Sequence, residues 1–472
     1  MLRLPRLAIG TIQAEADTQP ISWALMELLV AAGSQVQHFH SRACFSPLNA
    51  ALPVTGLDSR HLDSWLMSRE VCREMFIHGC AATDLALVEG RFASHDRHAA
   101  TACSGDPFGE TAAEGGAEEK SAQEGSKLDT LCDWLDLPRL VVLDASRIQT
   151  CLVPERPAQI DGLLLDRVRG PGQAYHLQTT LEALWDVPVL GALAYLPELR
   201  QAVTRLPRGT APPRELCQEL ADQLRPYADP RRIMDLAARR EMPPVRPHLF
   251  LEPHPAPPSR RLTVAVAYDT AFNCYFPDTL DLLEVQGAKV LDFSPLRDEA
   301  LPHDTDVVYM GCGHPELFAE ALTGNHCMLS ALRSHISAGR RVYAEGGGLA
   351  YLCQYLETPS GSRFPMVGAL PAVARLNPRP ARVRAVEVTL RQGNWLGDAG
   401  TRLRGYLNTN WLLEPAGPLA SHLAEPEHAL DLVGRYQVLG SRLHLNFAAH
   451  GEMLSSFFTP HRSAAVPSVG VR

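Results

Sequence analysis

A glycine-rich turn between an apolar strand and an apolar helix constrains the fold of this chain more than any other stretch. Residues 341–351 read RVYAEGGGLAY, in which Val342 and Tyr343 are typical of the end of a buried strand and Leu349 opens a helix. The three glycines that begin at Gly346 allow a turn too sharp for side chains. This is the arrangement of a nucleophile elbow, whose apex residue would be Cys or Ser. The sequence therefore predicts the mounting of a nucleophile, with glycine at its apex.

Length and charge narrow the class of protein. A chain of 472 residues usually exceeds one core, so two or three domains are expected. A net charge of −9 and the lack of a basic stripe argue against a nucleic-acid partner. No run of ~18 apolar residues predicts a membrane span. The first residues lack the apolar core of a secretory signal, and the eleven cysteines include no C-x-x-C pair. We expect a cytoplasmic protein with reduced thiols.

The first half of the chain alternates apolar strands with helical patterns, which predicts an α/β domain over residues 1–241 with a doubly wound parallel sheet. Its first strand ends in Gly10 and Thr11, where nucleotide-binding folds cradle phosphate. If Thr18 is the magnesium hydroxyl, Asp17 stands where a P-loop needs lysine. A carboxylate at ~4 Å from a triphosphate is unfavourable by several kcal/mol. The loop is therefore expected not to hold ATP in the usual way.

A later strand, near residues 82–90, ends in Glu89 and a glycine. In a nucleotide-binding sheet such an acid lies at the carboxyl edge, near Mg²⁺. A capping or solvated carboxylate is the alternative, and the sequence leaves both open. Residues 94–127 follow, rich in Ala, Gly, Glu and Ser, and are expected to form a flexible acidic insert.

A proline-rich linker is predicted at residues 242–260, then a second α/β domain over 261–458 and a disordered tail over 459–472. In the second domain a buried strand runs into the turn Gly311, Cys312, Gly313, the elbow comes next, and a late strand carries His444. In glutamine amidotransfer these three features would be an oxyanion-stabilising turn, the thiolate and its general base. Residues 311–313 are called the oxyanion turn below.

At these motifs the whole chain resembles the cobyrinic acid a,c-diamide synthase family of ATP-dependent, glutamine-using amidoligases. Residues 311–316, GCGHPE, match the family's Gly-Gly-Gly-Tyr-Pro-Glu, and residues 344–349, AEGGGL, match its Ala-Glu-Cys-Gly-Gly-Leu. His444 falls on the histidine that partners that cysteine. The resemblance implies a P-loop-like synthetase domain followed by a flavodoxin-like class I glutamine amidotransferase domain. It also implies ATP and Mg²⁺ as cofactors, although neither is assured here.

The departures from the family pattern affect both parts of the reaction, glutamine hydrolysis and the use of ATP. The family's nucleophile is Gly346 here, and its P-loop lysine is Asp17. Loss of the cysteine alone would leave an enzyme fed by free ammonia, and loss of the lysine alone would leave a glutaminase. Loss of both predicts a pseudoenzyme that acts as a binding or regulatory protein. The alternative is an active ATP-dependent cobyrinate a,c-diamide synthase, or a related amidoligase, that uses ammonia.

The remaining thiols and histidines have ordinary interpretations. Cys312 is interpreted as a small residue that fills its turn, and Cys353 as a core residue about one turn into the elbow helix. For His444, pocket-lining and purely structural roles both stay open. His38, His40 and His78 show no metal-ligand pattern, so no metal is predicted.

The resemblance also suggests partners. A corrinoid or other tetrapyrrole ligand, or an active paralogue, would be the inherited candidates. No nucleic acid or membrane is expected as a partner, and the sequence leaves homodimerisation open.

Overall fold

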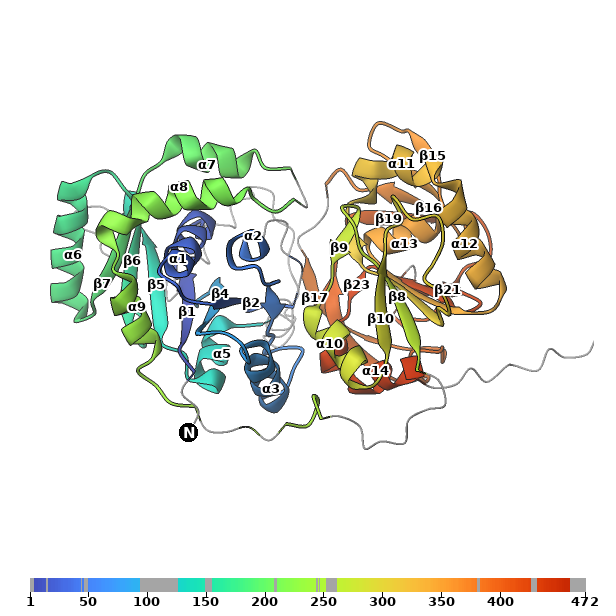
Figure 1. Ribbon diagram of the computed structural model, residues 1–472, viewed down its shortest axis with the longest axis horizontal. Helices are drawn as coiled ribbons and strands as arrows, with labels where there is room; N and C mark the ends of the chain where they lie inside the picture. The colour runs from blue at the N-terminus through green and yellow to red at the C-terminus, as the bar shows by residue number, and fades with distance from the viewer. Residues whose placement is uncertain are drawn as a thin grey trace, which may run out of the picture.

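The computed structural model describes residues 4–13, 16–43, 45, 50–93, 126–148, 155–207, 210–242, 245, 247–251, 261–379, 383–425 and 431–458. In these ranges the chain forms two α/β units that lie side by side (Figure 1). Most of the predicted acidic insert, most of the predicted linker and the whole predicted tail lie outside the described residues. No helix of the described ranges is long and apolar enough to cross a membrane.

The first unit is built on a parallel sheet. Within the described residues it has seven strands in the order β3-β2-β4-β1-β5-β6-β7. The strands are β1 (Arg6–Thr11), β2 (Val36–His40), β3 (Arg60–His61), β4 (Leu85–Arg91), β5 (Arg139–Asp144), β6 (Gly162–Val168) and β7 (Val189–Ala194). The helices are α1 (Gln19–Ala31), α2 (Ala51–Thr55), α3 (Arg69–Gly79), α5 (Leu128–Leu135), α6 (Pro171–Trp185), α7 (Pro197–Thr204), α8 (Arg214–Leu224) and α9 (Pro230–Ala237).

Helices cover both faces of this sheet (Figure 1). On one face α1, α8 and α9 pack their buried side chains with Leu7 and Ile9 of β1. On the other face α3, α5 and α6 pack with Ala8 of β1 and Val88 of β4. Successive side chains of a strand point to opposite faces, so neighbouring residues of β1 enter two different cores. The prediction of a doubly wound sheet is confirmed.

The second unit combines a mainly parallel sheet with smaller sheets. In the described part of the chain its main sheet runs β10-β8-β11-β13-β22-β21-β20, with β21 and β20 antiparallel. Its strands are β8 (Thr263–Ala267), β10 (Lys289–Phe293), β11 (Val307–Met310), β13 (Arg341–Glu345), β20 (Ala420–Ser421), β21 (Val433–Arg435) and β22 (Val438–Ser441). The smaller sheets comprise β9 (Phe272–Cys274) with β12 (Cys312–Gly313), then β14 (Cys353–Glu357), β15 (Arg363–Pro365), β16 (Leu370–Leu376) and β19 (Trp411–Pro415), then β17 (Arg384–Thr389), β18 (Arg402–Leu407) and β23 (Leu443–His444). The helices are α10 (Pro277–Val285), α11 (Ala319–Gly324), α12 (His326–Ser337), α13 (Gly347–Leu352) and α14 (Gly451–Phe458).

One placement differs from the sequence interpretation. The elbow helix α13 ends at Leu352, and Cys353 begins β14 and is not part of the helix. Cys353 is fully buried, so its interpretation as a core residue is confirmed although its element was wrong. The apolar run Leu349, Ala350, Tyr351 and Leu352 continues into Cys353, and periodicity over so short a run does not separate helix from buried strand.

The two units meet through charged and aromatic contacts. Arg60 of β3 forms ion pairs with Asp278 and Asp281 of α10. Tyr406 of β18 donates a hydrogen bond of 2.6 Å to the Asp63 carboxylate. Burial raises the pKa of Asp278 to about 6, against the opposing charge of Arg60. Because a buried carboxylate is costly without its cation, these contacts specify one arrangement of the two units.

Candidate active site

The elbow of the second unit has the geometry predicted for it. Gly346 lies between β13 and α13 with φ +50° and ψ −107°, a backbone conformation that L side chains rarely adopt. A Cβ on Gly347 would lie 2.7 Å from the carbonyl oxygen of Gly313, and one on Gly348 would lie 2.5 Å from that of Met310. The last two glycines are therefore required for close backbone approach, and the first provides a strained apex without a side chain.

The Cys312 thiol lies over this apex. A Cβ built on Gly346 would be 2.8 Å from Cys312 Sγ. The same sulfur lies 3.5 Å from His444 Nε2 and 3.8 Å from its Nδ1. The structure thus brings Gly346, Cys312 and His444 together, with Gly311 and Gly313 on either side of the cysteine. Cys312 does fill its turn, as the sequence indicated, but its sulfur also occupies the space above the elbow.

The electrostatics of this cluster disfavour a thiolate. Burial, with the Glu345 carboxylate and the Cys274 thiol, raises the pKa of the Cys312 thiol well above its usual range. Burial lowers the pKa of His444 to about 4. At neutral pH the pair is therefore a thiol beside a neutral imidazole. Since the thiolate is the reactive form of cysteine, this sulfur is a poor nucleophile.

We expect Cys312 to resist alkylation in the native protein. Iodoacetamide should modify exposed Cys327 at least ~10-fold faster than Cys312, because Cys312 is both buried and protonated. Peptide mapping by mass spectrometry over a time course at pH 7.5 measures both rates in one sample. Unfolding in urea should remove the difference. Equal rates in the native protein would show that the Cys312 thiol is accessible and activated.

His444 is held by the first unit as well as the second. It lies on β23, which pairs with β18 through Tyr406. The ring of Phe45, from the first unit, lies 4.8 Å from the His444 ring and 4.6 Å from that of Phe276. The histidine is 2% exposed. The first unit therefore covers the side of the second unit on which a general base would act.

In the first unit, the predicted phosphate-loop residues lie at the carboxyl edge of the sheet. Gly10 and Thr11 end β1, and Gly10 pairs with Gly90 of β4. A Cβ on Gly10 would lie 2.5 Å from the Gly90 carbonyl oxygen, so the approach of two strands already accounts for this glycine. Glu89 on β4 lies in register with Ile9, so the structure does bring Glu89 to the same edge.

The described parts of the loop make hydrogen bonds both to a distant strand end and within the loop. Gln13 accepts a hydrogen bond of 2.7 Å from the Asp144 backbone N–H. The Asp17 carboxylate accepts one of 3.1 Å from the Gln19 N–H at the start of α1. Thr18 is the N-cap of α1 but makes no capping hydrogen bond with its side chain. Residues 10–19 include no lysine or arginine. The Asp17 carboxylate thus occupies the N-terminus of α1, where a phosphate would otherwise bind favourably.

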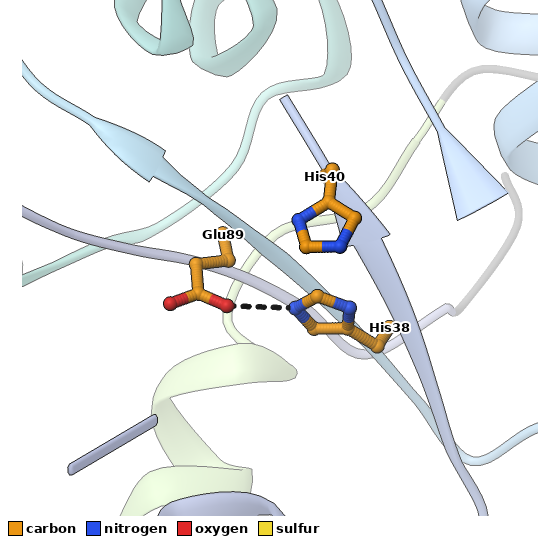
Figure 2. Close-up of side chains that lie close together, drawn as sticks. All are labelled: His38, His40 and Glu89. Atoms are coloured by element: carbon orange, nitrogen blue, oxygen red, sulfur yellow. Dashed lines mark hydrogen bonds and ion pairs between the residues drawn. The ribbon is translucent and has the colours of Figure 1, made fainter. Parts of the chain in front are cut away.

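Sequence reasoning missed a cluster formed by His38, His40 and Glu89 (Figure 2). His38 Nε2 lies 3.0 Å from Glu89 Oε2, and His38 Nδ1 lies 2.7 Å from Ser59 Oγ. His40 is the register partner of Glu89 on the neighbouring strand. The available signal was His-x-His on one strand, which places both rings on one face. His78, grouped with them in the sequence interpretation, lies elsewhere, 2.9 Å from Asp281.

A strained glycine elbow, a turn against it and a histidine on a neighbouring strand define a glutamine amidotransferase-like α/β domain, here joined to a doubly wound parallel-sheet domain. Residues 263–451 match the CobB/CobQ-like glutamine amidotransferase domain family. Over nearly its whole length the chain is similar to cobyrinate a,c-diamide synthases.

Similarity to that family extends over nearly the whole chain. The cobyrinate a,c-diamide synthase of Dehalococcoides mccartyi is 27% identical over 97% of this chain and 98% of its own. That of Syntrophotalea carbinolica is 29% identical over 94% and 96%. Among solved structures, a glutamine amidotransferase aligns with 42% of this chain and 99% of its own, at 16% identity and a TM-score of 0.32.

Proposed function

We propose that this protein is a member of its family that neither hydrolyses glutamine nor uses ATP, and that it acts as a binding or regulatory protein. Its ligand would be a corrinoid or related tetrapyrrole, as the names of its relatives suggest, or its partner an active paralogue. The observation that carries the proposal is the Cys312 sulfur, which lies where a side chain on Gly346 would have to be.

Acyl transfer from glutamine needs a thiolate at the apex of the elbow and free backbone N–H groups aimed at the developing oxyanion. Here the apex, Gly346, has no side chain, and the thiol that lies against it, Cys312, belongs to the oxyanion turn itself. That thiol is protonated, as argued above, and the adjacent imidazole of His444 is buried. The geometry therefore supports loss of glutamine hydrolysis more directly than the missing cysteine alone.

The nucleotide half-reaction is expected to be lost for an independent reason. Asp17 places a negative charge at the start of α1, and its carboxylate already bonds the Gln19 N–H. Phosphoryl groups bound at a helix start need those N–H groups and a nearby cation. The Asp17 carboxylate repels a phosphate and also occupies the Gln19 N–H that would donate to it. Both effects weaken ATP binding, so the usual binding mode is disfavoured.

One observation favours a second function, an ammonia-using amidoligase. Glu89 lies at the carboxyl edge beside the end of β1, where a cation that holds a nucleotide would be placed. Such an enzyme would need ATP and ammonium but no glutaminase thiol. This candidate predicts ATP-dependent amidation of cobyrinic acid, whereas the proposed function predicts none.

The two functions are separated by assays of the full-length wild-type protein. We expect no release of glutamate from glutamine, and no ATP hydrolysis with Mg²⁺, cobyrinic acid and ammonium, above a blank without protein. Binding of cobyrinic acid should still appear as a change in its visible spectrum or by calorimetry. ATP-dependent amidation with ammonium would establish the second function. Glutamate release that Cys312→Ser abolishes would overturn the first.

A further inference from the structure

We propose that His38, His40 and Glu89 bind one borderline divalent transition-metal ion, of the zinc, cobalt(II) or iron(II) type, at the carboxyl edge of the first sheet. The site is separate from the thiol cluster of the second unit, and the proposal does not rest on the loss of catalysis.

The backbone brings the three side chains together from two paired strands. His38 and His40 are two residues apart on β2, so both point to one face, and Glu89 on β4 is the register partner of His40. One ligand atom from each of the three lies within 4.8 Å of the others. The rings of the two histidines are 4.7 Å apart at 88° to each other (Figure 2). Two imidazoles and a carboxylate thus converge on one region.

The hydrogen bonds around the cluster orient the ligands. Ser59 Oγ lies 2.7 Å from His38 Nδ1 and fixes the ring, so that His38 Nε2 faces Glu89 Oε2 at 3.0 Å. Metal-binding histidines commonly have such a partner on the nitrogen that does not bind the ion. A metal ion would replace the proton that His38 Nε2 and Glu89 Oε2 share. Both atoms would stay near their present positions, because the ligand atoms of tetrahedral zinc are ~3.3 Å apart.

His40 supplies the observation that points most directly to a missing partner. Its Nε2 is shielded from solvent and has no hydrogen-bond partner among the described residues. A buried polar nitrogen without a partner costs ~1–3 kcal/mol, so the site gains when the nitrogen acquires a ligand. The 4.8 Å limit within the cluster exceeds the tetrahedral spacing, so the ligand atoms would have to move closer together when an ion binds. Within the described residues, no hydrogen bond restrains His40 Nε2.

The protonation states suit a metal ion. Burial and the charge of neighbouring His38 lower the pKa of His40 to about 3, so its ring is neutral at physiological pH. Burial would raise the pKa of Glu89, but the hydrogen bond with His38 acts against it and the pKa is lowered. A neutral imidazole and a carboxylate are the forms in which histidine and glutamate bind metal. Imidazole favours zinc, iron and similar ions over Mg²⁺, which prefers oxygen ligands.

The proposal is tested by titrating EDTA-treated full-length protein with Co²⁺ and following its visible absorption, with Zn²⁺ as competitor. The expected result is one tightly bound ion per chain that Zn²⁺ displaces and millimolar Mg²⁺ does not. His40→Gln and Glu89→Gln should each weaken binding at least ~100-fold, more than loss of a supporting hydrogen bond usually does. His78→Gln, a histidine paired with Asp281 outside the cluster, should bind like the wild type.

Folding of the variants is checked separately by thermal denaturation without metal. Zn²⁺ should raise the melting temperature of the wild type and of His78→Gln, but not of the two cluster variants. The proposal is overturned if the wild type binds no Co²⁺, or if folded His40→Gln and Glu89→Gln bind as tightly as the wild type. A thiolate charge-transfer band on Co²⁺ binding would place the ion on cysteine and also overturn it. Displacement by Mg²⁺ would overturn the choice of a borderline ion.

Discussion

The double variant Cys312→Gly/Gly346→Cys is expected to hydrolyse glutamine at least ~100-fold faster than a blank without protein, because it places a thiol on the elbow apex and clears the oxyanion turn. The wild-type Cys312 sulfur would be 2.8 Å from the new Cβ, so the two changes are needed together. The elbow backbone is already in place, at φ +50° on Gly346. Glutamate release at saturating glutamine measures the gain.

The single variants are the matched controls. Gly346→Cys alone should stay near the wild-type rate, since its side chain meets the Cys312 sulfur. Cys312→Gly alone should also stay near the wild-type rate, because it removes the thiol that contacts His444 and adds none. A folded double variant without glutaminase activity would show that the site has been lost beyond these two positions. Full activity of Gly346→Cys alone would show that Cys312 does not obstruct the apex.

The Glu345→Gln variant is expected to be more stable than the wild type by on the order of 4 kcal/mol at pH 8, and by less than about 1 kcal/mol at pH 5. Burial raises the pKa of Glu345 to about 8, from 4.5. Between these values the folded protein holds a proton that the unfolded chain has lost, so the stability of the wild type falls as pH rises from about 4.5 to 8. Glutamine keeps the neutral form at every pH.

The substitution preserves the contacts of the carboxyl group. Glu345 Oε1 accepts hydrogen bonds from the Tyr343 hydroxyl at 2.7 Å and from the Leu445 N–H at 3.3 Å, and the glutamine carbonyl can accept both. Urea denaturation at pH 5 and pH 8 measures the difference. Glu387→Gln, an exposed partner of Arg404, should leave both curves unchanged. A Glu345→Gln variant less stable than the wild type at pH 8 would contradict the raised pKa.

Much of the fold was readable from local pattern. The parallel strands of the first unit and the helices between them follow apolar runs that each lie within one stretch of sequence, so their positions were predicted closely. The three consecutive glycines at residues 346–348 likewise indicate a sharp turn from the local sequence alone. The strands between residues 353 and 421 were not predicted, because strand formation there depends strongly on the partners of each strand in a sheet.

The candidate sites were readable only in part, since they depend on pairs of residues far apart in the chain. Cys312 could be placed in a turn, but its distance from Gly346 depends on how β11 and β13 lie together. His38 and His40 could be placed on a strand, but their approach to Glu89 depends on the register of β2 and β4. A one-residue change in that register would send the side chains to opposite faces.

By itself, then, the sequence determined the alternation of strands and helices, the elbow with glycine at its apex and the carboxylate of Asp17 in the phosphate loop. These follow from side-chain size, charge and local backbone freedom, which act within a few residues. Only the tertiary structure decided that the Cys312 thiol covers the elbow, that Phe45 of the first unit packs on His444, and that His38, His40 and Glu89 converge. Those contacts arise from strand register and from the packing of two units, where many weak interactions between distant residues act together.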